Sequence, residues 1–325
     1  MEKKRVLVTG IGGNVGQGII RNIRVTGFPI EVIGCNVSGF SAGNHLCDKF
    51  YQIPYAFAEN YISSITDVVN NEKIDLIIPS TDYEVYYLAK NKAKIPCAIA
   101  VSDEGAAEIY LDKYKTFLHH QKYNIPYAPT FLPAEYDGSF TEFIVKPREG
   151  RGSRGLYINP PALDGFTDEY MVQKLYKGAE ITTAFYVNKQ AELHGFISLE
   201  RELENGATNE CQVNRRYDKG IELILLKIIQ HANIRGSANL QCIVTDDGTI
   251  MPFELNCRIS GTNSIRSNFG FEDVKYTLEE FLYHIPLSKP NVIDGIAIRI
   301  MMDVIYPNQT DKSKLSDNSV RSFIY

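Results

Sequence analysis

One stretch near the end of the chain combines acid and amide side chains in a spacing that suits metal chemistry. Residues 236–262 read GSANLQCIVTDDGTIMPFELNCRISGT, and the Asp-Gly pair at 247–248 between two extended runs predicts a hairpin with a two-residue loop. In that register Gln241 faces Glu254, and Asn256 lies two residues further along on the same face. Carboxylate and amide oxygens gathered in this way suit a hard cation such as Mg²⁺.

The two faces of the predicted hairpin differ in character. The polar face continues with Asn239 opposite Asn256, and Arg258 has the same parity, with a fork that suits a phosphate. The other face is predicted to be apolar, with three facing pairs: Leu240 with Leu255, Cys242 with Phe253, and Val244 with Met251. An ordinary half-buried hairpin would show the same alternation, so the rest of the chain must decide between the two interpretations.

The composition narrows the class of protein. The net charge of −5 and the absence of a dense basic run argue against a nucleic-acid partner. No apolar stretch approaches the roughly 20 residues that span a bilayer, and the N-terminus does not resemble a signal peptide. The six cysteines show no CxxC spacing, so we expect reduced thiols in a cytoplasmic protein and no zinc site.

The N-terminal third alternates between strand and helix patterns. Strands are predicted at 5–10, 30–35, 74–79 and 96–101, and helices at 15–25, 61–71 and 83–94. Such alternation is typical of a parallel sheet with helices on both faces, so we expect a Rossmann-like domain.

A glycine-rich turn follows the first strand. Gly10, Gly12, Gly13 and Gly16 come close to a dinucleotide-binding fingerprint, which also requires an acid after the second strand. Asn36 stands at that place, and a turn of this kind is also needed to pack a helix closely on a sheet. An NAD(P)-dependent oxidoreductase therefore remains an alternative, and a Rossmann-like domain without a nucleotide is favoured.

The middle of the chain holds a second glycine-rich segment. A single helix is predicted over 103–123, with Asp112-Lys113 inside it. A strand at 143–145 then ends on Lys146, and the loop at 148–155 contains three glycines and three arginines. Glycines let backbone N–H groups approach phosphates, and a lysine adds a point charge, although a flexible surface loop would look similar.

The following segment predicts an antiparallel sheet covered by a helix. Strands are expected at 170–173, from Glu180 onward, at 191–200, at 209–213 and at 296–303. The helix at 220–232 carries one apolar face, which we expect to pack on this sheet: Ile221, Ile224, Leu225, Ile228, Ile229 and Ala232. The polar tail after Pro307 is expected to be loosely ordered.

Taken in order, these motifs resemble the ATP-grasp superfamily, and within it the carbamoyl-phosphate synthase large-subunit-like ligases. The resemblance covers nearly all of residues 1–305 and rests on five motifs: Asp112-Lys113, Val145-Lys146-Pro147 with GRGSRG, Val172-Gln173-Lys174-Leu175 with Glu180, Gln241, and Glu254-Leu255-Asn256-Cys257-Arg258. It implies a mixed α/β and α+β fold. A Rossmann-like domain (1–110) would precede a small lobe with a glycine-rich lid (111–178) and a large lobe with the metal-binding hairpin (179–325).

The resemblance also implies how ATP would be held. Lys113 and Lys146 would contact the phosphates, and Glu180 would hold the ribose hydroxyls. The lid over the phosphates would include Gly150, Gly152, Ser153 and Gly155. The hinge against adenine would be formed, largely through backbone groups, by Gln173, Lys174 and Leu175.

Metal and catalytic roles follow in the same way. Gln241, Glu254 and Asn256 would bind one or two Mg²⁺, while Lys146 and Arg258 would stabilise the transferred phosphoryl group. The chain departs from the family pattern at Gln241, where relatives often have an acid, so one metal site is expected to be weak. The hinge also has Gln173-Lys174 where an acid is common.

The predicted reaction is ATP-dependent joining of a carboxylate to an amine, or less commonly a thiol, through an acyl phosphate. Small-molecule substrates and a homodimer are expected. Arg201, Arg215 or Arg216 could anchor a substrate carboxylate or be ordinary surface residues, and the 44–55 segment and Asp82 could shape the second pocket. Asp82 could equally begin the next helix as an N-cap or first-turn acid. A non-catalytic ATP-binding protein is a further alternative.

Overall fold

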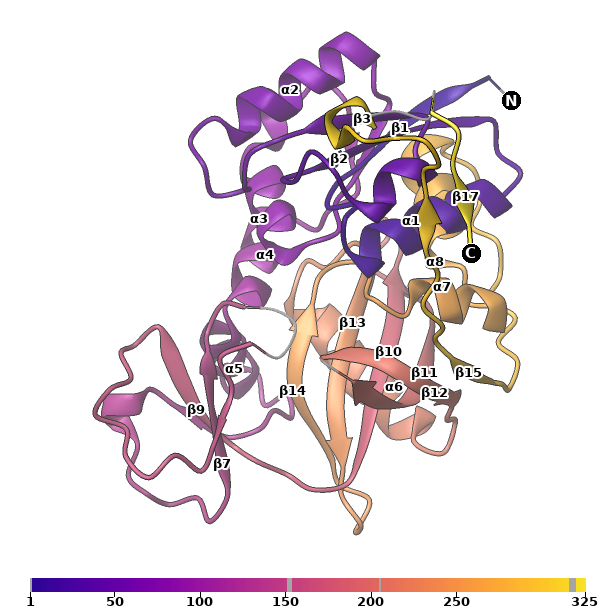
Figure 1. Ribbon diagram of the computed structural model, residues 1–325. Coiled ribbons are helices and arrows are strands. Elements are labelled where there is room, and N and C mark those ends of the chain that lie inside the picture. The colour runs from indigo at the N-terminus through magenta and orange to yellow at the C-terminus, as the bar shows by residue number, and fades with distance from the viewer. Residues whose placement is uncertain (1, 151–153, 205, 316–319) are drawn as a thin grey trace.

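The computed structural model describes residues 2–150, 154–204, 206–315 and 320–325. Figure 1 shows three parts: an N-terminal layer, a small β-rich lobe and a large sheet, with the C-terminal hairpin lying beside the N-terminal layer. None of the described helices combines the length and the apolar character that a membrane span requires.

The N-terminal part is a five-stranded parallel sheet in the order β3-β2-β1-β4-β5. The strands are β1 (Lys4–Val8), β2 (Ile30–Asn36), β3 (Lys49–Gln52), β4 (Leu76–Ile78) and β5 (Ala98–Ile99). The helices are α1 (Asn14–Val25), α2 (Tyr61–Glu72) and α3 (Asp82–Lys90), with 3-10 turns at Ala42–Leu46 and Lys92–Lys94. Successive β1 residues enter different cores: Leu7 packs with α2 and α3, whereas Val6 and Val8 pack with α1. The predicted Rossmann-like sheet with helices on both faces is therefore confirmed, and β3 is an addition.

The single helix predicted over 103–123 is wrong. The structure has α4 (Glu104–Leu111) and α5 (Lys113–Lys122), separated at Asp112. The Asp112 carboxylate accepts hydrogen bonds from the backbone N–H groups of Tyr114 and Lys115, at 2.8 and 3.2 Å. An aspartate that caps a new helix ends the preceding one, because its backbone leaves the helical conformation.

The small lobe is a four-stranded antiparallel sheet in the order β6-β9-β7-β8. Its strands are β6 (Thr130–Phe131), β7 (Phe143–Pro147), β8 (Tyr157–Ile158) and β9 (Tyr170–Lys174), with a 3-10 turn at Pro133–Glu135. The two long strands were predicted, and the two-residue strands were not.

The large sheet has six antiparallel strands in the order β14-β13-β10-β11-β12-β15. They are β10 (Ala179–Val187), β11 (Leu193–Glu204), β12 (Ala207–Val213), β13 (Gly236–Val244), β14 (Ile250–Asn256) and β15 (Ile296–Ile298). One face is covered by α6 (Asp218–His231) through the predicted apolar residues, with Ile221, Ile224, Leu225 and Ile228 buried. The sequence patterns therefore located both the sheet and the helix that covers it.

The opposite face is partly covered by helices that were not predicted. These are α7 (Asn263–Arg266), a 3-10 turn (Ser267–Phe269), α8 (Asp273–Thr277) and a π-helical turn (Leu278–Leu282). Phe271 and Tyr276 pack on Ala184, Tyr186 and Ile197 of the sheet. The rest of this face carries the polar side chains of the hairpin.

The C-terminal segment differs from expectation in two places. The strand predicted over 296–303 stops at Ile298. The tail contains an antiparallel pair, β16 (Val304–Ile305) with β17 (Phe323–Ile324), and a 3-10 turn at Lys312–Lys314. The ring of Tyr306 lies 6.0 Å from that of Phe40, so this segment contacts the N-terminal domain.

The β13–β14 hairpin keeps the predicted register at its polar end. Gln241 faces Glu254, Leu240 faces Leu255, and Asn239 faces Asn256. Nearer the tip the register is shifted by one residue, so three observed pairs differ from the prediction: Cys242 with Pro252, Ile243 with Met251, and Val244 with Ile250.

Two local features explain this shift. The loop is three residues long, 246–248, because Thr245 and Thr249 form the last backbone hydrogen bond, and Gly248 adopts the left-handed conformation with φ 84°. The predicted two-residue loop is therefore wrong. A β-bulge at Phe253 then absorbs the extra residue and restores the predicted pairing at Glu254.

Candidate functional site

The predicted metal-binding side chains form one hydrogen-bonded row on the open face of the large sheet. Asn256 Nδ2 donates to Glu254 Oε1 at 3.1 Å, and Gln241 Nε2 donates to Asn256 Oδ1 at 3.3 Å. Asn256 is buried, whereas Glu254 and Gln241 are half-buried. The row arises because residues of matching parity on paired strands project to the same face.

Arg201 extends this row onto β11. Its Nη2 donates to Gln241 Oε1 and to Glu180 Oε1, both at 2.6 Å, and its Nε also reaches Glu180 at 3.0 Å. The Arg201 side chain is only 13% exposed. Glu180, predicted to hold ribose, is thus ion-paired within the protein, and Arg201 is not an ordinary surface arginine.

Lys146 approaches the same row from the small lobe. It is 6% exposed, and its Nζ donates to the Phe253 carbonyl at 3.4 Å. The bulge at Phe253 presents this carbonyl, which also accepts from the Tyr127 hydroxyl at 2.8 Å. Burial lowers the pKa of Lys146 to about 8, and Lys113 adds to the shift while the Glu254 carboxylate opposes it.

Glu254 carries the negative charge at the centre of the site. Burial pushes its pKa upward, but the ammonium groups of Lys113 and Lys146, the Asn256 hydrogen bond and the guanidinium of Arg258 outweigh burial, so the pKa lies below its ordinary value. The carboxylate is therefore ionised at neutral pH and available as a metal ligand.

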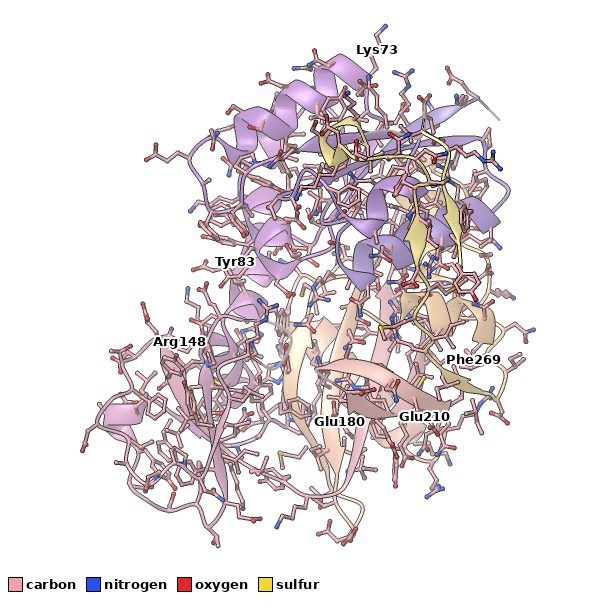
Figure 2. All side chains as sticks on the ribbon, viewed as in Figure 1. Lys73, Tyr83, Arg148, Glu180, Glu210 and Phe269 are labelled. Atoms are coloured by element: carbon pink, nitrogen blue, oxygen red, sulfur yellow. The ribbon has the colours of Figure 1, made fainter. Side chains whose placement is uncertain are left out.

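The Asp112-Lys113 motif joins α5 to the loop after β7. The Asp112 carboxylate pairs with Arg148, with Nη2 to Oδ2 at 2.5 Å, and the Lys113 Nζ donates to the Gly150 carbonyl at 3.1 Å. The Arg148 guanidinium also lies 5.3 Å from the centre of the Tyr114 ring. These contacts hold the start of the predicted lid against α5. Figure 2 labels Arg148 in the small lobe and Glu180 in the large sheet, which flank the site.

The lid itself is only partly described. Gly155 has φ 67°, a conformation that favours glycine, and a Cβ there would lie 3.2 Å from Pro147. A Cβ at Gly150 would meet only ordinary contacts with Pro147. Gly152 and Ser153 lie outside the described residues, so their predicted role in the lid stays a prediction.

The predicted hinge lies where β9 leaves the small lobe. Gln173 is buried and donates from Nε2 to Thr130 at 3.0 Å. The backbone N–H of Lys174 donates to the Pro129 carbonyl, and that of Leu175 donates to the Glu142 carbonyl. These two N–H groups are used within the protein, so in this conformation a hinge contact with adenine would rely on other backbone groups of the segment.

Arg258 connects the site to the N-terminal domain. Its Nη2 pairs with Asp82 Oδ2 at 2.7 Å, and the two side chains are 13% and 15% exposed. Asp82 is the first residue of α3, where Thr81 and Glu84 form a capping box. The Arg258 Nε is buried without a hydrogen-bond partner among the described residues. Asp82 was predicted either to border a substrate pocket or to begin the next helix as an N-cap or first-turn acid; it does begin α3, and its pairing with Arg258 was missed.

The glycine-rich turn after β1 is explained by packing. A Cβ at Gly16 would lie 2.7 Å from the Gly10 carbonyl, and one at Gly12 would lie 2.6 Å from the Asn36 side chain. Gly10 has φ 58°. The Asn36 side chain thus packs directly against the turn, at the strand end where a dinucleotide-binding domain requires an acid.

Arg215 and Arg216 lie apart from the row. They line a hollow of about 290 Å³ with Gln212 and Asp294, and Arg215 pairs with Asp294 at 3.1 Å. Arg215 also lines a hollow of about 340 Å³ that includes Ser198. Ser198 and Arg201 have opposite parity on β11, so their side chains project from opposite faces of the sheet. Of the three candidate arginines, Arg201 is the one that the structure brings to the predicted metal ligands.

Hairpin counting could have found the Arg201 contact. Residues 188–192 connect β10 to β11, and pairing outward from Val187 and Leu193 would place Glu180 opposite residue 200. A bulge after Tyr186 moves the partner to Arg201. Counting from the loop would therefore have placed the partner of Glu180 one residue away from Arg201. An error of one residue puts a side chain on the opposite face of the sheet.

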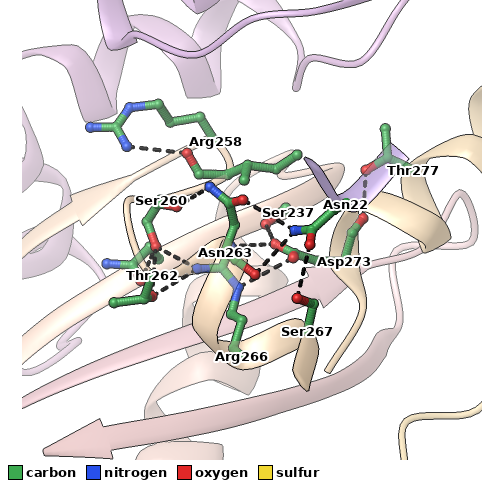
Figure 3. Close-up of polar contacts among 12 residues, drawn as sticks. Asn22, Ser237, Arg258, Ser260, Thr262, Asn263, Arg266, Ser267, Asp273 and Thr277 are labelled. Carbon is green, nitrogen blue, oxygen red and sulfur yellow. Dashed lines mark hydrogen bonds and ion pairs between the residues drawn. The ribbon is translucent and has the colours of Figure 1, made fainter. Parts of the chain in front are cut away.

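A second polar network on the same sheet face was missed entirely. Figure 3 shows Arg266 within this network. Arg266 pairs with Asp273 at 2.5 Å and donates to Ser260 and Thr262 at 2.8 and 2.9 Å. Arg266 and Asp273 are fully buried. No pattern in residues 263–282 signalled these helices, because they are short and irregular.

The donor set fits one magnesium ion. Glu254 supplies an ionised carboxylate and Asn256 an amide oxygen, and Lys113 and Lys146 stand beside them. Mg²⁺ typically takes one or two protein oxygens and completes its shell with phosphate and water. Both amide oxygens already accept a hydrogen bond, but that of Asn256 accepts a long one of 3.3 Å from a neutral amide, whereas that of Gln241 accepts a short one of 2.6 Å from the Arg201 guanidinium.

Comparison with known proteins agrees with this architecture. Residues 6–100 match the family model described as PylC-like, N-terminal domain. No curated protein sequence matches the chain.

Several solved structures share the fold over most of their length. N5-carboxyaminoimidazole synthetase from Staphylococcus aureus is 16% identical with a TM-score of 0.70, over 91% of this chain and 80% of that chain. Phosphoribosylglycinamide synthetase from Anaerococcus prevotii is 18% identical with a TM-score of 0.68, over 95% and 86%. The biotin carboxylase domain of 2-oxoglutarate carboxylase from Hydrogenobacter thermophilus is 14% identical with a TM-score of 0.69, over 88% and 71%.

These structures include nucleotide complexes. The Staphylococcus aureus synthetase has been solved with ADP, and the Hydrogenobacter thermophilus domain with MgADP and bicarbonate. The parallel N-terminal sheet, the antiparallel sheets elsewhere and these likenesses agree with the fold class expected from the sequence. The chain shares the fold of these two synthetases and of the biotin carboxylase domain, and its residues 6–100 match the PylC-like N-terminal domain model.

Proposed function

We propose that the protein is an ATP- and Mg²⁺-dependent ligase that joins a carboxylate to an amine, or less commonly to a thiol, through an acyl phosphate. The observation that carries the proposal is the meeting of Lys146, Lys113 and Glu254 at the bulged hairpin. Two ammonium groups next to an ionised carboxylate suit a metal–triphosphate complex better than a metal ion or an anion alone.

Each residue has a distinct task in this proposal. Glu254 and Asn256 hold Mg²⁺, which when bound neutralises phosphate charge. Lys146 donates hydrogen bonds to a phosphate oxygen from a water-poor position, where electrostatic interactions are stronger. Lys113 adds a second cation beneath the lid. Arg258 meets the transferred phosphoryl group, with Asp82 holding its guanidinium in place until substrate binds.

The bound nucleotide would lie between the small lobe and the large sheet. The Gln173–Leu175 segment borders the adenine, and the glycine-rich loop closes over the phosphates. The second substrate then enters beside Asp82, at the carboxyl edge of the N-terminal sheet, which is where open α/β sheets bind their ligands. Small-molecule acids and amines are the proposed partners, and a homodimer in the cytoplasm is the proposed state.

The first test is thermal unfolding with Mg·ATP, with ATP plus chelator, and with NADPH. A ligand at 100 times its dissociation constant adds about 2.7 kcal/mol, which raises the Tm of a chain of this size by roughly 2–4 °C. We expect that shift with Mg·ATP and a smaller one when the metal is chelated. No shift with ATP alongside a clear shift with NADPH would overturn the ligase proposal and favour the oxidoreductase.

Turnover distinguishes a ligase from a protein that only binds ATP. Phosphate release should require one acid and one amine from a panel of amino acids, peptides and amino sugars. ATP binding without phosphate release for any pair would favour the non-catalytic alternative.

A further inference from the structure

Arg201 occupies a position that a metal ion would otherwise compete for. Its Nη2 donates to the Gln241 oxygen at 2.6 Å, the same oxygen that Gln241 would offer to a metal. The guanidinium is also fixed by two hydrogen bonds to Glu180 and by a contact of 3.4 Å between Nη1 and Thr208. It is largely buried, so its charge is poorly screened by water.

The residue type at position 241 also favours an arginine over a metal ion as its partner. A glutamine is neutral, so it cannot offset the charge of a dication, whereas its oxygen is a good acceptor for a guanidinium. The carboxylate of Glu180 on β10 accepts two hydrogen bonds from Arg201, so it too is directed to this guanidinium. Glu254 remains as the ionised metal ligand of the row.

We propose that the Arg201 guanidinium replaces a second metal ion beside the triphosphate. This inference rests on the proposed function. The site then binds a single Mg²⁺ through Glu254 and Asn256, while Gln241 and Glu180 position Arg201. Gln241 is thereby reassigned from metal ligand to support for an arginine, and Glu180 from ribose contact to the partner of that arginine.

The chemistry of a guanidinium makes the replacement reasonable. Arginine stays protonated at any working pH and carries several N–H donors in a fixed plane. Part of that plane holds Gln241 and Glu180, and among the described residues the remaining Nη1 edge has only the long contact to Thr208. A phosphate oxygen would receive a stronger, charge-assisted hydrogen bond there.

The decisive experiment counts metal ions per bound nucleotide. The full chain, in excess over AMP-PNP, is titrated with Mn²⁺, and free Mn²⁺ is followed by electron paramagnetic resonance. We expect one Mn²⁺ per nucleotide in the wild type. Two Mn²⁺, with a spectrum broadened by coupling between neighbouring ions, would overturn the inference. This count requires no variant and no turnover.

A pair of substitutions should convert the site. Gln241→Glu with Arg201→Met supplies a carboxylate and removes the guanidinium, so this double variant should bind two Mn²⁺ per nucleotide. Gln241→Glu alone should still bind one, since the new carboxylate pairs with Arg201. Two ions in the single variant would contradict the proposed role of Arg201.

Nucleotide affinity gives an independent measure. Arg201→Met should weaken Mg·AMP-PNP binding by roughly tenfold or more, because a charge-assisted hydrogen bond is lost, and Arg201→Lys should weaken it less. Arg24→Met is the matched control, since Arg24 pairs with Asp48 at 2.9 Å on the distant α1 and should leave affinity unchanged. Equal affinity in wild type and a folded Arg201→Met would overturn the inference.

The two levels of the proposal fail in different ways. A wild type that does not bind AMP-PNP at all overturns the proposed function and the inference with it. A wild type that binds the nucleotide with two Mn²⁺ overturns the inference alone.

Discussion

Two polar clusters share one face of the large sheet, and they differ in how their charges are balanced. The Arg266 network (Ser237, Ser260, Thr262, Arg266 and Asp273) is fully enclosed. Its one guanidinium meets one carboxylate, and hydroxyl groups take further hydrogen bonds. The row at Glu254 is half-exposed instead, and the cations around it outnumber its carboxylates.

The difference separates a structural cluster from a candidate binding site. A buried ion pair whose hydrogen bonds are satisfied has no capacity left for a ligand. The row at Glu254 has an ionised carboxylate, a lysine whose pKa is lowered by burial, and a buried Arg258 Nε without a partner in the described part of the chain. Perturbed groups of this kind gather at functional sites.

The largest expected effect breaks the enclosed cluster. Arg266→Met leaves Asp273 charged and buried without its partner, which should lower the free energy of unfolding by about 3–5 kcal/mol. Urea unfolding measures the loss, and Arg24→Met, at a partly exposed ion pair, should change stability by less than about 1 kcal/mol. A folded Arg266→Met of wild-type stability would mean that the network is not structural.

The next effect is on chemistry and leaves the fold intact. Glu254→Gln keeps the shape but removes the carboxylate, so phosphate release should fall by about 10²–10³-fold or more, by analogy with losing one preorganised electrostatic group. Circular dichroism and thermal unfolding should stay close to wild type. Glu210→Gln, at an exposed carboxylate of the same sheet, is the control. Full turnover in Glu254→Gln would show that Glu254 is not an essential metal ligand.

A smaller effect concerns pH. The pKa of Lys146 is about 8 in the folded protein and 10.5 in a free side chain, so between these values the unfolded chain binds more protons. Stability should therefore rise with pH across that window in the absence of nucleotide.

Nucleotide binding should show the opposite trend. A bound triphosphate favours protonated Lys146, so affinity should fall as pH rises through about 8, with proton uptake measurable by calorimetry in buffers of different ionisation enthalpy. Lys146→Met should bind more weakly and lose this dependence. The same pH profile in wild type and Lys146→Met would assign the titration to another group.

The smallest effect tests how closely α1, which follows the glycine-rich turn, packs against Asn263 at the start of α7. A Cβ at Gly18 would lie 2.3 Å from the Asn263 side chain, so Gly18→Ala should cost about 1–3 kcal/mol through overpacking. Gly13→Ala is the matched control, because its Cβ would lie at an ordinary 3.6 Å from the Gly10 carbonyl. A stability loss at Gly13 as large as at Gly18 would contradict the packing explanation.

The long strands and helices were predicted well from the sequence, because burial of one face leaves a periodic pattern of apolar residues. Alternation in β13 and β14 and the apolar face of α6 reflect burial, which periodicity records directly. The same holds for the parallel sheet of the N-terminal domain. The break at Asp112 was missed because its neighbours on both sides have helical patterns, and only the capping hydrogen bonds reveal two helices.

Contacts between distant segments could not be predicted in the same way. The Asp82–Arg258 pair joins residues 176 positions apart, and the Arg266 network depends on short helices without periodicity. For the site, the family resemblance supplied residue types and the hairpin register supplied part of their arrangement. Which partner each charge meets is set by tertiary packing, as Arg201 with Glu180 illustrates. The domain boundaries and individual roles stay predictions.

The bulge at Phe253 has a consequence for how such a site can change. A hairpin with a two-residue loop and no bulge would pair Gln241 with Glu254 in the same way as this hairpin, which has one more loop residue and one bulge. Loop length and bulge therefore compensate each other, and the row of side chains does not move. The extra residue presents a carbonyl that accepts from Lys146 and Tyr127. One inserted residue can thus add an acceptor to the pocket while Gln241 and Asn239 keep their partners Glu254 and Asn256, and only the pairs nearer the tip shift.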